Sequence, residues 1–287
     1  MISGRKKYLC FSRIILKSLI PWLIFIQSFC SPLFSQTNDF PYTLKKQDLY
    51  LTAFSVATFI SGEYVKARME YDLSIEDIEQ LSRNEINGLD RHATYYWNTG
   101  LNKTSDVLLY SMIALPATML IPSIRNKEWE EISTLGLMYL QTLTFARGIT
   151  NHTKSYAGRI RPYLYNTSLT AEERYGFQGN EAHHASTSFF SGHSAVSFAS
   201  AVFLSKIYTD IYGKNTWSYL IWGSSLTAAS VVAFCRVGSG EHFTSDVLAG
   251  ALIGSAIGYL VPVLHRKKTE NTTLSLTPES FYLSVSF

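Results

Sequence analysis

Five long apolar segments without a charged side chain most limit what this chain of 287 residues can fold into. They cover residues 107–124, 132–146, 189–205, 217–235 and 247–264, and none contains Asp, Glu, Lys or Arg. Most approach the roughly 20 residues that a membrane-spanning helix needs. The pattern predicts an all-α bundle of about five to six apolar, transmembrane helices.

The composition agrees with burial in lipid. Charged residues make up 16% of the chain and hydrophobic residues 46%, whereas soluble proteins carry about 25% charged residues. A further apolar run, 49–62, has only 14 residues and is short for a membrane span. The alternative is a soluble helical bundle whose buried helices are very apolar.

Glycine spacing in the last apolar run predicts a close contact between helices. Gly250, Gly254 and Gly258 recur every four residues, which places them on one face of a helix. A face of glycines lets a neighbouring helix approach closely.

Positive charges between the apolar runs predict an orientation in the membrane. Lys and Arg fall in alternate connections, at 125–127, 206–214 and 266–268. The positive-inside rule leaves these connections in the cytoplasm, so the connections 147–188 and 236–246 face the exported side. This orientation requires that the run 49–62 does not cross the membrane fully.

The two ends of the chain differ from the bundle. Residues 1–35 combine Lys and Arg with an apolar run, which is typical of a signal peptide, and an uncleaved anchor is the competing interpretation. Near the other end, Phe281, Leu283, Val285 and Phe287 alternate with polar residues, which predicts a strand. The predicted division is a signal peptide or anchor (1–35), an N-terminal helix with a polar exported-side segment (36–104), a core (105–264) and a C-terminal tail (265–287).

Cysteine count and net charge exclude several classes of protein. Cys10, Cys30 and Cys235 are too few for a disulfide framework or a cysteine-rich zinc site. A net charge of +3 without a basic stripe argues against nucleic-acid binding. The sequence also gives no sign of an obligate protein partner.

The first cluster of reactive residues lies in the outward connection 147–188. Lys154, Arg159 and Arg161 fall within eight residues. Arg offers a planar fork and Lys a point charge, so the set suits an anion with three oxygens. Arg159 has two interpretations: a phosphate ligand, or a residue that steadies the loop.

A second cluster, Ser191-Gly192-His193, stands at the mouth of an apolar run. The first turn of a helix has free backbone N–H groups and the positive end of the dipole. We therefore expect an anion site at this position.

A third cluster lies in the connection 236–246. His242 and Asp246 are four residues apart and share a helix face, so the Asp can accept from one imidazole nitrogen and leave the other as a nucleophile or base. Arg236 adds a donor for phosphate. A thiol phosphatase based on Cys235 is excluded, because Glu241 stands where the pattern Cys-x5-Arg needs Arg.

Together these clusters resemble the type 2 phosphatidic acid phosphatase (PAP2) superfamily, which shares its site with vanadium haloperoxidases. The three signatures of that family are Lys-x6-Arg-Pro, Pro-Ser-Gly-His and Ser-Arg-x5-His-x3-Asp. The chain has Lys154-x6-Arg161-Pro162, Phe190-Ser191-Gly192-His193 and Cys235-Arg236-x5-His242-x3-Asp246. It departs from the pattern at Phe190 and Cys235, which precede the reactive groups, and the matched region runs from about residue 105 to residue 264.

The resemblance implies a phosphatase with a phosphohistidine intermediate. His242 attacks phosphorus, Asp246 holds its ring, and His193 protonates the leaving alcohol and then activates water. The implied ligands of the phosphoryl oxygens are Lys154, Arg161, Ser191, Gly192 and Arg236. No metal or other cofactor is implied.

The resemblance also implies the class of substrate and the location. The apolar segments beside the site favour phosphate monoesters or pyrophosphates of lipids, such as phosphatidic acid, phosphatidylglycerol phosphate, polyprenyl pyrophosphate or lipid A phosphates. The active site is expected on the periplasmic side of a membrane in a bacterial-type cell envelope. Two alternatives stay open: a soluble periplasmic acid phosphatase without strict specificity, and a vanadate-dependent haloperoxidase.

Overall fold

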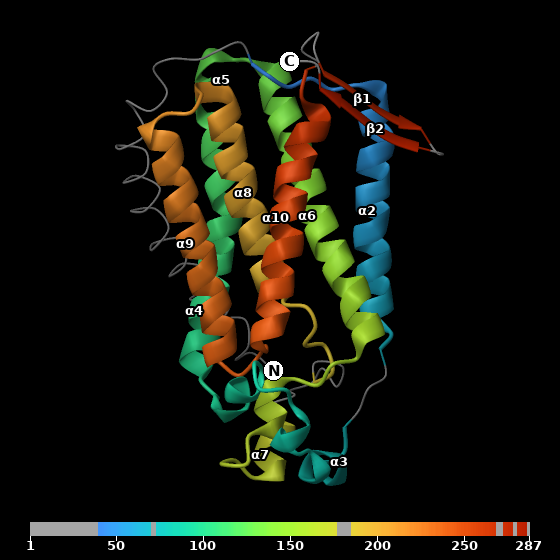
Figure 1. Ribbon diagram of the computed structural model, residues 1–287, viewed down its shortest axis with the longest axis vertical. Helices are drawn as coiled ribbons and strands as arrows, with labels where there is room; N and C mark the ends of the chain where they lie inside the picture. Colours follow the sequence, from blue (N-terminus) through green and yellow to red (C-terminus); the bar gives the residue numbers. More distant parts are fainter. Residues whose placement is uncertain (1–39, 70–72, 177–184, 268–271, 278–279, 286–287) are drawn as a thin grey trace, which may run out of the picture.

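The computed structural model describes residues 40–69, 73–176, 185–267, 272–277 and 280–285, and it shows long helices that run along one axis (Figure 1). The long helices are α2 (Lys46–Ala67), α4 (Thr99–Ala114), α6 (Trp129–Ala157), α8 (Gly192–Tyr212), α9 (Thr216–Gly238) and α10 (Thr244–His265). The predicted all-α bundle is confirmed. The predicted signal peptide or anchor over 1–35 lies outside the described residues.

Shorter elements complete the described chain. The 3₁₀-helix η4 (Leu115–Leu120) and α5 (Ile121–Asn126) follow α4, and α5 lies at the upper end of the bundle in Figure 1. The remaining short elements are α3 (Ile75–Gln80), η2 (Arg83–Glu85), η3 (Arg91–Tyr95), η5 (Pro162–Tyr165) and α7 (Ala171–Gly176). Helices α3 and α7 lie at the opposite end of the bundle in Figure 1.

Prolines and capping side chains decide where several helices begin. The run 107–124 is divided among α4, η4 and α5, because Pro116 and Pro122 lie in the first turns of the two later elements and lack an N–H. Asn98, Ser191 and Asn215 cap α4, α8 and α9, each with a side-chain oxygen that accepts a backbone N–H three residues later.

Helix α8 is the centre of the bundle. It contacts α4, α6, α9 and α10, and 16 of its 21 residues are buried. In contrast, α9 buries only 6 of its 23 residues and therefore lies on the outside. Helix α2 packs along α6, where Gln141 Nε2 donates to Thr52 Oγ1 at 2.8 Å.

The three glycines of α10 face α8, as their spacing predicts. A Cβ atom on Gly250, Gly254 or Gly258 would lie 2.6, 2.0 or 2.3 Å from a backbone oxygen of α8. These oxygens belong to Ser191, Ala195 and Ala199. Because no side chain fits in that space, the two backbones are in direct contact along more than two turns.

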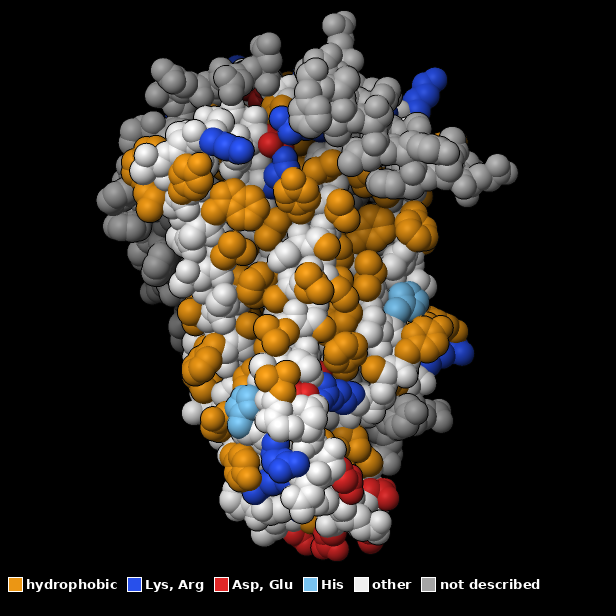
Figure 2. All heavy atoms as spheres, in the orientation of Figure 1, with side chains coloured by type: hydrophobic (Ala, Val, Ile, Leu, Met, Phe, Trp, Pro, Cys, Tyr) orange, Lys and Arg blue, Asp and Glu red, His pale blue; other side chains and the backbone are white. Residues whose placement is uncertain are grey.

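The outer surface is apolar over the middle of the bundle. Within the described chain, three helical stretches are long and apolar enough to cross a membrane: Thr99–Asn126, Thr216–Gly238 and Thr244–His265. Phe234 and Leu252 on this surface are 72% and 73% exposed. Figure 2 shows hydrophobic side chains spread over the middle of one face, with Lys, Arg, Asp and Glu nearer its two ends. Such a surface suits lipid rather than water.

A two-stranded hairpin follows the last helix. Strand β1 (Thr272–Thr277) pairs antiparallel with β2 (Ser280–Val285), with Thr272 opposite Val285 and Thr277 opposite Ser280. The predicted C-terminal strand is confirmed over β2, whereas its partner β1 was not predicted. Phe287, the last residue of the predicted strand, lies outside the described residues.

We expect Gly254→Ala to destabilise the bundle by about 2 kcal/mol or more, because its Cβ would meet the backbone of Ala195 and force α8 and α10 apart. The matched control is Gly223→Ala in α9, where a Cβ has no neighbour within 4 Å. Circular dichroism of the detergent-purified variants during heating gives the unfolding midpoints. Equal midpoints for the two variants would contradict the close contact of α8 and α10.

Candidate active site

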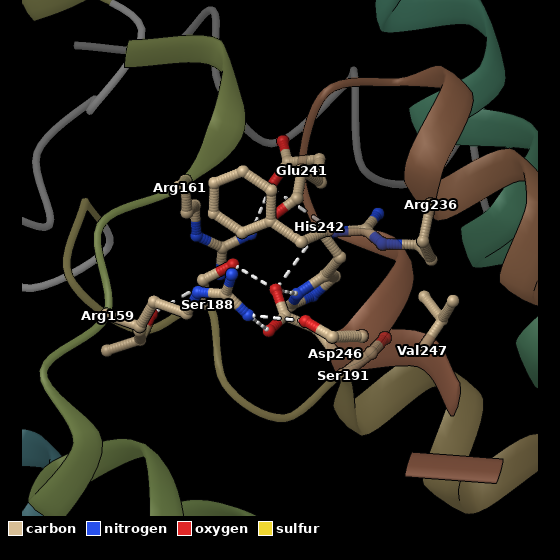
Figure 3. Close-up of polar contacts among 12 residues, drawn as sticks. Arg159, Arg161, Ser188, Ser191, Arg236, Glu241, His242, Asp246 and Val247 are labelled. Carbon is tan, nitrogen blue, oxygen red and sulfur yellow. Dashed lines mark hydrogen bonds and ion pairs between the residues drawn. The ribbon is translucent and has the colours of Figure 1, made fainter. Parts of the chain in front are cut away.

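The three predicted clusters meet at one end of the bundle. The C-terminal end of α6, the N-terminal end of α8 and the loop between α9 and α10 all lie at the lower end in Figure 1. This arrangement follows from the antiparallel course of α8, α9 and α10 along the bundle axis. Residues far apart in the sequence therefore surround one small volume (Figure 3).

Lys154 and Arg161 are both buried, although both have basic side chains. Lys154 lies in the last turn of α6 and is 8% exposed, and it forms no hydrogen bond or ion pair with another described residue. Gly158 ends the helix with a φ of 54°, a left-handed conformation that turns the chain toward Arg161. Arg161 is 3% exposed and donates to the side chain of Glu241 and to Thr187 Oγ1.

The second cluster forms the start of α8, as predicted. Ser191 is the N-cap, and its Oγ accepts from the backbone N–H of Ser194 at 3.3 Å. Gly192 lies against α6, where an added Cβ would be 3.2 Å from Thr150. His193 Nε2 lies 2.8 Å from Asp106 Oδ1 of α4, a partner that the sequence did not predict.

Arg236 and Glu241 bring the end of α9 into the same volume. Arg236 is 4% exposed and donates to the side chains of Asn102 and Ser105 of α4, and its Nη2 lies 3.3 Å from Glu241 Oε2. Its Nε has no hydrogen-bond partner among the described residues. The predicted cationic residues Lys154, Arg161 and Arg236 are therefore all buried at this end.

His242 and Asp246 adjoin these cations. His242 Nδ1 lies 3.7 Å from Asp246 Oδ2, longer than a hydrogen bond, and Nδ1 has no other partner in the described chain. Oδ2 of Asp246 instead accepts from Ser188 Oγ at 2.5 Å and from the backbone N–H of Phe243 at 2.9 Å. Such contacts are often long without substrate and shorten when it binds.

The surroundings of His242 keep its imidazole neutral. Burial lowers its pKa well below the usual value, and the positive charges of Arg161, Lys154 and Arg236 lower the pKa further. A neutral imidazole keeps a nitrogen lone pair for attack on an electrophile. Within the described ranges, no three His, Cys, Asp or Glu side chains are grouped so as to hold a metal ion.

Arg159 connects the candidate site to an aspartate that the sequence did not predict. Asp90 is fully buried and accepts from Arg159 Nη2 at 2.8 Å and from the backbone and side chain of Ser245 at 2.8 and 2.7 Å. Arg159 Nη1 donates to Asp246 Oδ1 at 2.5 Å. Of the two interpretations of Arg159, these contacts favour the one in which it steadies the loop.

The two departures from the family signatures are packing residues. Phe190 and Cys235 are 1% and 4% exposed, and neither side chain contacts the charged groups through a hydrogen bond. They fill the interior immediately before Ser191 and Arg236. The reactive positions are therefore intact around them.

Several residues of the site were not assigned from the sequence: Asp90, Asn102, Asp106, Ser188 and Glu241. Four of them reach their partners from distant segments of the chain, and no spacing rule connects such positions. The position of Glu241 in the sequence was informative, because a carboxylate directly before His242 and near Arg236 can form an ion pair with a buried cation of the site.

Comparison with known proteins agrees with the geometry. Residues 135–270 match the family model described as PAP2 superfamily, which confirms the resemblance that the three motifs predicted. The chain is 30% identical over 162 residues to a PA-phosphatase related-family protein of Dictyostelium discoideum, covering 54% of this chain and 58% of that protein. It is 29% identical over 160 residues to phospholipid phosphatase 1 of Rattus norvegicus, covering 46% and 56%.

A bacterial relative is also similar. The lipid A 4'-phosphatase of Porphyromonas gingivalis is 25% identical over 133 residues, covering 46% of this chain and 51% of that protein. The chain thus spans little more than half the length of the curated relatives that it matches.

We expect Asp90→Asn to lower the free energy of unfolding by about 1–3 kcal/mol at pH 7, because Arg159 loses a buried partner. Burial raises the pKa of Asp90, but hydrogen bonds from Ser245, Arg159 and Asn87 outweigh it and lower the pKa below the usual value. The ionised carboxylate therefore stabilises the fold above about pH 4, and this contribution is lost as the pH falls through the lowered pKa.

The measurement is unfolding of both proteins in detergent between pH 7 and pH 3. The stability difference between wild type and Asp90→Asn should shrink as the pH falls. Glu76→Gln, which changes an exposed carboxylate of α3, is the control. A difference that grows toward low pH would contradict the role of the Asp90–Arg159 ion pair.

Proposed function

We propose that this chain, which over residues 135–270 belongs to the PAP2 superfamily, is a membrane phosphatase acting on phosphate monoesters or pyrophosphates of lipids. The observation that carries the proposal is a buried, neutral histidine, His242, beside Lys154, Arg161 and Arg236 at one end of an apolar bundle. Buried cations without enough anionic partners are unfavourable unless an anion binds among them. A phosphoryl group meets that requirement.

In the first step, His242 attacks the phosphorus atom. Because Nδ1 lies on the side of Asp246, Nε2 is the nitrogen left to form the N–P bond. As this bond forms, the P–O bond to the lipid breaks and its electron pair leaves with the oxygen. That oxygen takes a proton from His193, which is oriented by Asp106. Burial and the charge of Arg236 lower the pKa of His193 to about 4, so its protonated form depends on the carboxylate of Asp106 and on the negative charge of the bound phosphate.

In the second step, water completes the hydrolysis. His193, now neutral, removes a proton from a water molecule whose oxygen attacks phosphorus. The N–P bond breaks, its electron pair returns to His242, and inorganic phosphate leaves. Throughout, Lys154, Arg161 and Arg236 balance the negative charge on the phosphoryl oxygens, together with the N-terminal end of α8.

Lipid substrates are supported by the surface beside the site. A pocket of about 620 Å³ lies between η3 and the adjoining ends of α9 and α10. Its lining is mainly apolar and includes Tyr95, Trp97, Phe234 and Val247, and Val247 directly follows Asp246. An acyl chain could lie there while its phosphate occupies the site. The same class is supported by the names of the relatives: a PA-phosphatase related-family protein, a phospholipid phosphatase and a lipid A 4'-phosphatase.

The central test is phosphate release by the detergent-purified protein in the presence of EDTA. Phosphatidic acid, an undecaprenyl pyrophosphate analogue and p-nitrophenyl phosphate are compared. We expect a lipid phosphate to be preferred, and His242→Ala to lower release at least about 10³-fold because the nucleophile is lost. Alkaline quenching of a reaction with radiolabelled substrate should trap protein-bound phosphate in wild type but not in the variant.

The control is His152→Gln. His152 lies in α6 with its Nε2 2.9 Å from Ser61 Oγ of α2, and its release rate should stay unchanged. Release that is unaffected by His242→Ala would refute the histidine mechanism. A preference for p-nitrophenyl phosphate would favour the soluble acid phosphatase, and turnover only with vanadate and peroxide would favour the haloperoxidase.

The orientation in the membrane is tested by one introduced cysteine at a time in a Cys10→Ser, Cys30→Ser background, which keeps the buried Cys235. Tyr156 lies at the site end of α6 and is 89% exposed, and Lys214 is exposed in the turn between α8 and α9 at the opposite end. We expect an impermeant maleimide to label Tyr156→Cys in intact bacterial spheroplasts, because the site faces the exported side. Lys214→Cys should react only after the membrane is opened. The reverse pattern would place the site in the cytoplasm.

A further inference from the structure

Glu241 already occupies the position between the two arginines that are proposed to hold phosphate. It lies directly before His242 and is 3% exposed. Its carboxylate accepts from Arg161 and from Asn102 Nδ2 at 3.1 Å, and its Oε2 forms an ion pair with Arg236 Nη2 at 3.3 Å. Figure 3 shows Glu241 between Arg161 and Arg236, next to His242.

The carboxylate is ionised in this position. Burial raises its pKa, but the positive charges of Arg161, Arg236 and Lys154 outweigh burial and lower the pKa below the usual value. A carboxylate and a phosphoryl group place oxygens at similar distances from a guanidinium fork. One oxygen of Glu241, Oε2, contacts both Arg161 and Arg236, while Oε1 accepts from Asn102. Glu241 therefore occupies the position that one oxygen of a phosphate would take between the two arginines.

Glu241 does not neutralise the whole group of cations. Lys154 forms no ion pair with another described residue, and Arg236 Nε has no hydrogen-bond partner in the described chain. Burial and the positive charge of Arg161 lower the pKa of Lys154 well below its usual value, so Glu241 does not fully compensate the charges around Lys154. A phosphate monoester carries −1.5 to −2 at pH 7, whereas a diphosphate carries more.

We propose that Glu241 is an internal anion that competes with the substrate for Arg161 and Arg236, and that it thereby adjusts the site to a phosphate monoester rather than a diphosphate. The inference rests on the proposed function for its substrates. An incoming phosphoryl group has to take over the N–H groups that Glu241 occupies, and its repulsion by the Glu241 carboxylate grows with the negative charge of the ligand. Removal of the carboxylate charge should strengthen the binding of every phosphoanion, and most of all the binding of those with the highest charge.

The test compares wild type with Glu241→Gln, which keeps the shape and removes the charge. Binding of inorganic phosphate to the detergent-purified proteins is measured by calorimetry, which needs no turnover. We expect the dissociation constant for phosphate to fall about tenfold in Glu241→Gln. The ratio of kcat/KM for the undecaprenyl pyrophosphate analogue over that for phosphatidic acid should rise at least about fivefold, mainly through KM.

Two further variants separate charge from structure. Glu241→Asp keeps the carboxylate and should show the wild-type ratio of kcat/KM for the two substrates. If Glu241 acted only through the length of its side chain, the shorter Asp would change this ratio. Glu130→Gln removes an exposed carboxylate in the first turn of α6, at the opposite end of that helix from Lys154, and should leave phosphate affinity unchanged. Unfolding midpoints of all variants show whether each is folded.

The results that would overturn this proposal differ from the results that would overturn the proposed function. The proposal would be overturned if phosphate bound Glu241→Gln no more tightly than wild type, or if phosphate bound to neither protein. Glu241 would then serve only to align the arginines. An unchanged substrate ratio with tighter phosphate binding would overturn the part on specificity. Tighter phosphate binding in a protein that hydrolyses no ester would support the internal anion while the proposed function failed.

Discussion

The direct backbone contact between α8 and α10 is the interaction on which the site depends. Gly254 removes the side chain that would separate the two helices, and its neighbours a turn away do the same. The contact continues to the helix starts, where the backbone N–H of Ser191 donates to the carbonyl of Asp246 at 3.1 Å and Ser194 Oγ donates to Val247 O at 2.7 Å. The N-terminal ends of α8 and α10 thus lie side by side, and the positive ends of both helix dipoles face the volume that contains His242.

Two separate groups of buried charges are built on this frame. One consists of Asp90, Arg159 and Asp246, in which each charged group has a partner, and it supports the carboxylate beside His242. The other contains the cations around Glu241 and has more positive than negative charge. The first group has two carboxylates for one guanidinium and fixes the position of Asp246, whereas the second has more basic than acidic side chains and suits an anion from outside. The difference between the two groups explains why Arg159 and Arg161, only two residues apart, have different surroundings.

Much of the architecture was predictable, because the information is local. Charge-free runs give the helices, and the four-residue spacing of glycines gives the contact face of α10. The motif residues could be placed together only through their resemblance to a known family. Asp90 and Asp106 could not be found in this way, since each reaches its partner across 69 or more positions of the chain, through tertiary contacts that have no periodic signature. Glu241 is local but ambiguous, because a carboxylate beside a histidine is more often exposed to solvent.

The segments 73–98 and 158–176 explain how a charged site can stand at the end of an apolar bundle. They are held together by buried guanidinium groups that donate to backbone carbonyls: Arg83 Nε to Tyr165 O at 3.0 Å, and Arg174 Nη1 to Leu164 O at 2.7 Å and Ile78 O at 3.3 Å. These bonds satisfy carbonyls that water would otherwise have to reach. The segments also reach the site directly, because Asp90 of the first accepts from Arg159 of the second, and Arg159 donates to Asp246 beside His242. The polar segment before α4, which forms no part of the motifs, thus helps to fix the position of Asp246.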